Sequence, residues 1–407
     1  MMRMLQFEVE KVFCKFKNKA AIFLLLILLI ATSFLTMNRV EYRDAESGNA
    51  VSGIAAAGKL RAERNKWAGY LTGDVLAEVV RENTRINLTP EAQSQDIQEQ
   101  DKAYAQKQGI SVINELINNA FSKWRDYNYF AVDSVSEEEA KQVYERRISS
   151  LKEYLDSGEE TFPETQKKFL IQRYENLKTP FYYEYTEGWS ALLQNISTFI
   201  LMLALVIGFL VSGIFSDEFQ TKADSIFFSS RLGRNKAIVS KINAGLLIAT
   251  VLYVVFLVLY TAVVLLALGA DGAKCPIQLD FWRSSYNITF FEAYLLIAAG
   301  GYVGTLFAAI VSMIVSAATR STMTAVIVPF LILCAFPFLS RIITLPGICS
   351  FFPDQLLEVY LNIKEFNLVE FGGRVMSVST VIIPFYLFVS LILLPMLYGV
   401  YKKAEIK

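Results

Sequence analysis

Six apolar runs divide this sequence of 407 residues, and they constrain its fold more than any other feature. A helix needs about 20 apolar residues to cross a hydrocarbon core about 30 Å thick. Only 54% of the residues are hydrophobic, which is too few for a chain wholly embedded in lipid. We therefore predict an all-α integral membrane protein with six transmembrane helices and a large water-exposed part. The predicted helices span residues 20–38, 191–215, 242–268, 293–318, 323–339 and 378–401.

The water-exposed part lies between the first and second predicted crossings. Residues 39–190 are rich in Glu, Gln, Lys and Arg and contain no apolar run long enough to span a membrane. Helix-start signals recur there: Thr89 precedes Pro90, and Ser136 followed by Glu139 matches a capping box. We expect a separate domain built mainly of helices.

Basic residues gather at one set of helix ends. Short connections rich in Lys and Arg stay in the cytoplasm, according to the positive-inside rule. We therefore expect a plasma-membrane protein with both termini in the cytoplasm and the 39–190 domain outside. The basic residues that support this orientation are Lys222, Arg231, Arg234, Lys236, Lys241, Arg320, Lys402, Lys403 and Lys407.

Residues 1–19 have the pattern of an amphipathic helix. Apolar residues such as Leu5, Val9 and Val12 recur at helical spacing, while Lys11 and Lys15 fall on the other face. Such a helix lies in the headgroup region with its basic side chains toward anionic lipid. A plain basic flank for the first crossing is the alternative interpretation.

The connection at residues 216–241 joins the second and third crossings on the cytoplasmic side. Within it, residues 223–232 are long enough for two to three helical turns, and Ile226, Phe227 and Phe228 give them an apolar patch. We expect a short surface helix that docks into a groove on a soluble partner. A simple connecting loop that obeys the charge rule would carry the same basic residues.

The amino-acid sequence of this connection resembles the loop after the second membrane helix in permeases of type 2 (ABC-2 type) ABC transporters. In that family the loop forms a coupling helix that fits the cleft of a separate ATPase subunit. The family commonly has Gly after the Thr, where this chain has Lys222. The matching letters are Asp217-Glu218, Gln220-Thr221, Ala223-Asp224, Ser229-Ser230-Arg231, Gly233-Arg234-Asn235-Lys236 and Lys241.

The resemblance implies the membrane-spanning permease subunit of an ATP-driven exporter of an apolar or amphipathic substrate. A second permease chain, identical or different, would pair with it, and separate ATPase subunits would bind ATP and Mg. The chain itself would need no cofactor and would not be an enzyme. The residues implied in ATPase coupling are Asp217, Glu218, Gln220, Asp224, Phe227, Phe228, Arg231, Arg234 and Lys236.

The family pattern also implies a transport pathway and an outer re-entrant segment. In such permeases the second and fifth helices of two chains face each other across the pathway. Residues 341–377 would form the re-entrant segment, because their first half is apolar but too short to span. The residues implied in lining the pathway are Phe199, Met202, Leu203 and Val206, opposite Val326, Phe330, Leu333 and Phe336.

Several function classes are disfavoured by what the sequence lacks. There is no His, no Walker A motif and no CxxC pair, so neither His-based catalysis nor a metal site is expected. The formal net charge is zero, which gives no indication of nucleic-acid binding. No predicted crossing has a charged residue near its centre, which disfavours ion-coupled transport.

Two questions stay open at this level. Cys275 and Cys349 both fall in predicted outer loops and could form a disulfide in an oxidising compartment. A membrane-anchored receptor or scaffold, whose outer domain binds a peptide or a protein, is the alternative function. An ion channel is a third interpretation, disfavoured by the lack of charged pore-lining candidates.

Overall fold

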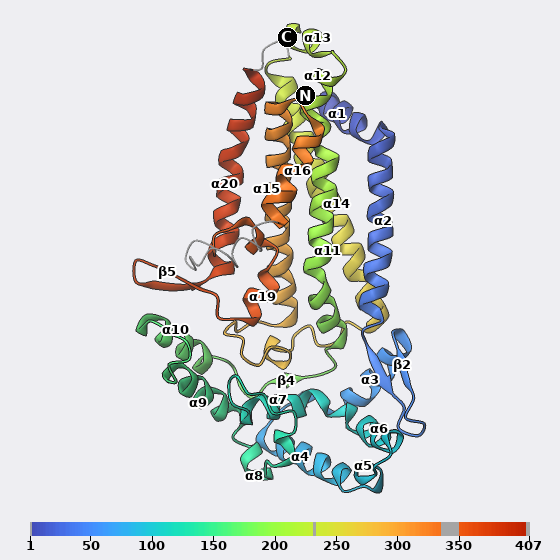
Figure 1. Cartoon of the computed structure of the whole chain (residues 1–407), viewed down its shortest axis with the longest axis vertical. Helices are drawn as coiled ribbons and strands as arrows, with labels where there is room; N and C mark the ends of the chain where they lie inside the picture. Colours follow the sequence, from blue (N-terminus) through green and yellow to red (C-terminus); the bar gives the residue numbers. More distant parts are fainter. Residues whose placement is uncertain (1, 231–232, 335–349, 404–407) are drawn as a thin grey trace.

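The computed structural model describes residues 2–230, 233–334 and 350–403, and these residues are mostly helical. Long helices run side by side in a bundle, and a domain of shorter helices lies at one end of it (Figure 1). Both chain ends lie at the opposite end of the bundle, together with the connection between the second and third long helices (Figure 1). We call these two ends of the bundle the domain end and the terminal end.

Five helices are long and apolar enough to cross a membrane. This number confirms the multi-pass membrane character that the apolar runs indicate. The second of these helices continues past a break at Ser212 into a further short helix. The five are α2 (Phe16–Met37), α11 with α12 (Glu187–Val211 and Gly213–Gln220), α14 (Lys236–Leu268), α15 (Phe290–Thr319) and α20 (Val378–Lys402).

The predicted fifth crossing at 323–339 is only partly described. Helix α16 (Thr322–Cys334) covers its first part, and residues 335–349 lie outside the described ranges. Thirteen helical residues span about 20 Å, which is less than the hydrocarbon core. A sixth crossing therefore stays a prediction.

The bundle has a packed centre and an apolar outer surface. In the most apolar stretch of α11, 67% of the residues are buried, and in that of α15 the share is 61%. The corresponding shares are lower in α2 (28%), α14 (33%) and α20 (22%). Small residues on α15 allow this close packing. A Cβ atom on Gly301 would lie 2.6 Å from Ile200 Cγ2 of α11, so only Gly fits there without a shift.

The domain at residues 39–183 is mainly helical, as predicted. Thr89 caps α5 with Pro90 in its first turn, and Ser136 with Glu139 forms the predicted capping box at α8. Two short antiparallel pairs, β1–β2 and β3–β4, were not predicted. The elements are β1 (Glu41–Arg43), β2 (Ala50–Ser52), α3 (Ile54–Arg64), β3 (Gly69–Tyr70), α4 (Gly73–Asn87), α5 (Pro90–Gln93), α6 (Ile97–Gln106), α7 (Ser111–Phe121), α8 (Glu137–Ala140), α9 (Val143–Asp156), α10 (Glu164–Glu175) and β4 (Tyr182–Tyr183).

The predicted re-entrant segment at 341–377 is described from residue 350 onward. It contains a turn of 3-10 helix, η5 (Pro353–Leu356), then α19 (Val359–Lys364) and the hairpin β5–β6 (Leu368–Phe371 and Arg374–Ser377). Gly372 and Gly373 form the two-residue turn with φ of 55° and 77°, as type I′ hairpin turns require. The hairpin projects sideways from the bundle, in the half that is nearer the domain end (Figure 1).

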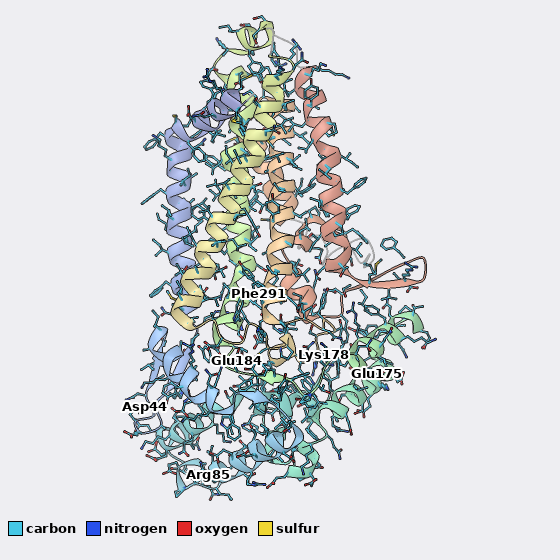
Figure 2. The ribbon with its side chains drawn as sticks, turned by 180° about the vertical axis from the view of Figure 1, so that it is seen from behind. Asp44, Arg85, Glu175, Lys178, Glu184 and Phe291 are labelled. Atoms are coloured by element: carbon cyan, nitrogen blue, oxygen red, sulfur yellow. The ribbon has the colours of Figure 1, made fainter. Side chains whose placement is uncertain are left out.

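Buried hydrogen bonds fasten the domain to the bundle. The guanidinium of Arg147, on α9, donates to the carbonyl oxygens of Trp282 and Ser284 at 3.1 and 2.9 Å. The Glu184 carboxylate accepts from the Gly272 amide at 2.7 Å. Figure 2 shows Glu184 near the junction of the two parts and Arg85 at the far end of the domain. The α14–α15 loop is therefore the main attachment point of the domain.

Candidate functional site

The connection between α11 and α14 folds into two short helices at the terminal end. Helix α12 continues from α11, and a turn at Lys222 leads into α13 (Asp224–Ser229). The predicted surface helix is therefore present but shorter than the predicted 223–232. Lys222 has φ of 56°, a left-handed conformation that Gly adopts without strain. This is the position where the resembling family commonly has Gly.

A buried lysine joins three segments at the terminal end. The Lys241 side chain, on the first turns of α14, is fully buried. Its Nζ donates to a Glu218 carboxylate oxygen at 2.7 Å, to a Glu8 carboxylate oxygen at 3.1 Å and to the Ile214 carbonyl at 2.8 Å. A buried ammonium is stable only when paired in this way. Lys241 thus ties α14 to α12 and to the N-terminal helix.

The N-terminal helix α1 (Met2–Cys14) adds further ion pairs to the same group. Lys11 pairs with Glu218, and Lys15, which follows α1, pairs with Asp217. We had expected these lysines to face anionic lipid, and the structure corrects this, because acidic partners on α12 hold both of them. Helix α1 is therefore joined to the protein body at the terminal end through its two buried residues, Glu8 and Val12, and by these ion pairs.

Aromatic rings hold α13 against the last helix. The Phe228 ring lies 5.2 Å from the Tyr401 ring and 5.9 Å from the Phe219 ring, and only 5% of Phe228 is exposed. The Phe227 ring also contacts Tyr401, at 5.9 Å. Ile226, by contrast, is 75% exposed. The two Phe residues face the body of the chain, and Ile226 is the outward apolar residue of α13.

The remaining predicted coupling residues are divided between buried and exposed positions. Asp217 and Glu218 are buried within the ion pairs described above. Arg234 donates to the Lys402 carbonyl at 2.7 Å, which again joins the connection to α20. Gln220 and Lys236 are exposed, and Asp224 is half-buried in the first turn of α13. Arg231 lies outside the described residues.

The predicted pathway residues do not form one surface within this chain. Phe199 is fully buried and stacks on Tyr260 of α14, with the ring centroids 4.5 Å apart. Val326, Phe330 and Leu333 instead line a small cavity of about 130 Å³ between α11, α15 and α16. Leu203 is fully buried, Met202 and Val206 are half-buried, and Phe336 lies outside the described residues.

Only one of the two cysteines of the predicted disulfide lies in the described residues. Cys275, fully buried in the loop after α14, forms no disulfide with either of the other described cysteines, Cys14 and Cys334. Cys349 lies outside the described residues, so their pairing stays a prediction. Burial raises the pKa of the Cys275 thiol to about 12, which leaves it protonated and unreactive at neutral pH.

Sequence reasoning missed the group of residues around Lys241. Lys241 was assigned to the basic flank of α14 and to the residues of the family resemblance, without a buried role, and Glu8 was given no role. One signal was present, because Glu8 falls three residues after Leu5 and four before Val12, on the apolar face of its helix. An acidic residue on such a face requires a buried cation as partner.

The terminal end therefore holds a short connection between two long helices, and ion pairs hold the buried acidic residues of α12. Among the described residues no group of three or more acidic or Cys side chains could hold a metal ion. No protein-family model, no curated protein and no solved structure was found to match this chain.

Proposed function

We propose that this chain is the membrane-spanning permease subunit of a type 2 ABC exporter in the plasma membrane. In this proposal α13 is the coupling helix, and a separate subunit binds ATP and Mg. The observation that supports this proposal most is the Lys241–Glu218 ion pair. The pair joins the α12–α13 connection to the long helices before and after that connection. The chain would export an apolar or amphipathic substrate together with a second permease chain.

The buried pair gives this proposal its mechanical basis. Glu218 lies on α12, which continues α11, and Lys241 lies on α14. Separating them would take one ion-pair partner from each buried charge, leaving Lys241 with Glu8 and Glu218 with Lys11. The cost is therefore below the roughly 3–5 kcal/mol of a buried charge with no partner at all. A push on α13 is therefore expected to move α11 and α14 together. The contacts of Phe228 with Tyr401 would extend that movement to α20.

The outward face of α13 is the surface offered to the ATPase. Ile226 supplies an exposed apolar side chain, and Gln220 and Lys236 are exposed on either side of it in the sequence. An apolar anchor with a polar rim is a common design of protein interfaces. Phe227 and Phe228 would support this face from behind and hold α13 in place.

Ile226→Glu tests the coupling role. The tagged full chain is expressed with the product of an adjacent reading frame that carries a Walker A motif, and the amount of co-purified ATPase is measured. The charge should remove most of the ATPase from the complex, because a desolvated interface excludes an unpaired charge. Ile97→Glu is the matched control, since Ile97 is 73% exposed but lies in the domain. Equal co-purification with both variants would contradict the proposal.

The proposed orientation places the terminal end in the cytoplasm. Single cysteines at Ser225 and Gln95, both exposed, are introduced into a chain whose native cysteines are replaced by serine. A membrane-impermeant maleimide applied to intact cells should label the Gln95→Cys chain and spare the Ser225→Cys chain until the cells are permeabilised. The opposite pattern would reverse the orientation and remove the coupling role.

A receptor or scaffold is the second candidate function. The observation that favours it is a large cavity at the domain end, lined by aromatic and charged side chains. The two candidates differ in their dependence on α13. A receptor needs no ATPase at the terminal end, so Ile226→Glu would leave its response unchanged.

A further inference from the structure

Two adjoining hollows lie where the domain meets the bundle, with volumes of about 700 and 690 Å³. Their walls come from α7 and the loop after it, from the loop between α14 and α15, and from the end of α19. The hollows share Glu115, Asp280, Phe281 and Lys364. Ligand sites commonly have volumes of about 300–1,000 Å³. The cavity is therefore large enough for an organic ligand.

One wall of the first hollow is built of aromatic rings. Trp124 stacks on Tyr154 with the ring centroids 4.7 Å apart, and Phe366 lies 5.7 Å from Trp124. Tyr127 and Tyr129 meet edge to face at 4.7 Å in the same hollow. Aromatic faces attract both apolar groups and cations. This wall would hold a flat or apolar group and tolerate a positive charge beside it.

Several charged residues around the cavity already have partners. Arg64 pairs with Glu187, and Arg125 pairs with Glu160 at 2.8 Å. Arg39 donates to the Gln194 side chain at 2.9 Å. The two ion-paired arginines contribute little net charge to a ligand, whereas Arg39, which lines the second hollow only, keeps its positive charge because Gln194 is neutral.

Other charged residues lining the cavity have no ion pair within the part of the chain that the structure describes. Glu115 and Asp280 are unpaired acidic groups in the region that both hollows share, where Lys364 is the unpaired basic group. Glu365 and Arg283 line the first hollow only, and the Arg283 guanidinium lies 4.8 Å from the Trp124 ring. The shared region thus has two carboxyl groups and one ammonium group.

The environment of the two shared carboxyl groups favours a cation bound beside them. Burial, with a smaller contribution from the charges of Glu187 and Glu115, raises the pKa of Asp280 to about 7. Burial likewise raises the pKa of Glu115, although this side chain opens onto the cavity. A carboxylate that is costly to ionise gains most when a cation binds beside it.

We propose that this cavity binds a short peptide that carries one basic and one aromatic side chain. The basic group lies between Glu115 and Asp280, and the aromatic group lies against Trp124 and Tyr154. Amide side chains on the walls, such as Asn119, can hydrogen-bond the peptide backbone. This inference does not rest on the exporter assignment, because a receptor could use the same cavity.

The test measures binding of a defined probe to the full chain in lipid nanodiscs. The probe is N-acetyl-(4-fluoro-phenylalanyl)-arginine amide, and ¹⁹F NMR line broadening gives its Kd. Two analogues replace arginine by citrulline, which is neutral, or by glutamate. Empty nanodiscs give the lipid background. The arginine probe should bind about tenfold more tightly than the citrulline analogue, since one charge interaction is worth about 1.4 kcal/mol.

Variants then locate the charge interaction. Glu115→Gln and Asp280→Asn should each lower the affinity for the arginine probe toward that of the citrulline analogue. Glu78→Gln is the control, since Glu78 is exposed on α4 and lies outside both hollows. Lys364→Gln should strengthen binding of the arginine probe. A folding defect would not produce that gain, so this variant separates loss of the site from loss of the fold.

Three results would overturn the inference. Equal affinity for the arginine and citrulline probes would remove the role of charge. Unchanged affinity in both Glu115→Gln and Asp280→Asn would place the binding elsewhere. Tighter binding of the glutamate analogue would assign the cavity to anionic ligands held by Lys364 and Arg283.

Discussion

Lys241 and Glu218 are twenty-three residues apart in the sequence, and their charged atoms lie 2.7 Å apart in a buried pair at the terminal end. The pair closes the connection between two long helices into a compact unit. Glu8 contacts the same ammonium at 3.1 Å, so the N-terminal helix is part of that unit. Any movement of the connection is expected to involve all three segments.

Lys241→Met should destabilise the protein by about 3–5 kcal/mol, because it leaves Glu218 and Glu8 buried with one fewer positive charge. Thermal unfolding of the purified chain measures the effect. Lys236→Met is the control, since Lys236 is exposed at the start of the same helix. Removing the acidic partners as well, with Glu8→Gln and Glu218→Gln, should restore part of the loss. Equal unfolding temperatures for the two Met variants would show that the buried pair contributes nothing.

Lys222→Gly should raise stability by up to about 1 kcal/mol, because Gly adopts the left-handed φ of 56° without a Cβ clash. Lys403→Gly is the comparison, since Lys403 has an ordinary φ of −86° at the end of α20. There Gly only adds freedom to the unfolded chain and should lower stability slightly. A loss of stability in Lys222→Gly, as large as in Lys403→Gly, would argue against this turn.

Gly301→Ala and Gly399→Ala should have opposite effects, although both residues lie in long apolar helices. A Cβ atom on Gly301 would lie 2.6 Å from Ile200 Cγ2 and 2.7 Å from the Tyr253 hydroxyl, so the helices must separate, at about 1–3 kcal/mol. Nothing lies within 4 Å of the same atom on Gly399, where Ala should gain about 0.5–1 kcal/mol. Thermal unfolding of both variants checks the packing of α15 against α11, and a neutral Gly301→Ala would contradict it.

Asp280 should make the stability of the protein depend on pH. Its pKa is about 7 in the folded protein and 3.8 in an unperturbed carboxyl, so the folded chain holds this proton over the intervening range. The free energy of unfolding therefore falls as pH rises from about 4 to about 7. The charged groups that act on it are Glu187, Glu115 and Arg64.

Asp280→Asn removes this titration. The variant should gain unfolding temperature relative to the natural chain when the pH is raised from 5 to 8. Asp126→Asn is the control, because Asp126 is exposed in the loop after α7 and its carboxyl is open to solvent. A constant difference between Asp280→Asn and the natural chain at both pH values would show that Asp280 does not hold its proton.

The elements that the sequence predicted correctly depend on local rules. Five of the apolar runs became long helices, because an apolar stretch of that length has few other stable forms in lipid. The capping box at Ser136 could be predicted because its two residues, Ser136 and Glu139, are three positions apart in the sequence. Lys241 and Glu8 are 233 residues apart, so no pattern within one helix shows that they meet. Only the unusual place of Glu8 on an apolar face pointed to a missing partner.

The orientation of side chains on short helices was equally hard to predict. Ile226, Phe227 and Phe228 are adjacent apolar residues, and the sequence gives no reason to prefer one as the outward residue. Tyr401, near the C-terminal end of the chain, packs against both Phe rings, so these rings face inward and Ile226 faces outward. The cavity at the domain end likewise combines distant segments, since Trp124 and Phe366 meet only after folding.

The most direct test of the coupling role is photocrosslinking from α13. The photoreactive residue benzoyl-phenylalanine replaces Ile226 in the full chain, and ultraviolet light is applied to membranes that also contain the ATPase from the adjacent reading frame. A crosslinked band that contains both proteins is expected from position 226 and not from position 97, which is exposed in the domain. Crosslinking from position 97, with none from position 226, would contradict the proposal that α13 receives the work of ATP hydrolysis.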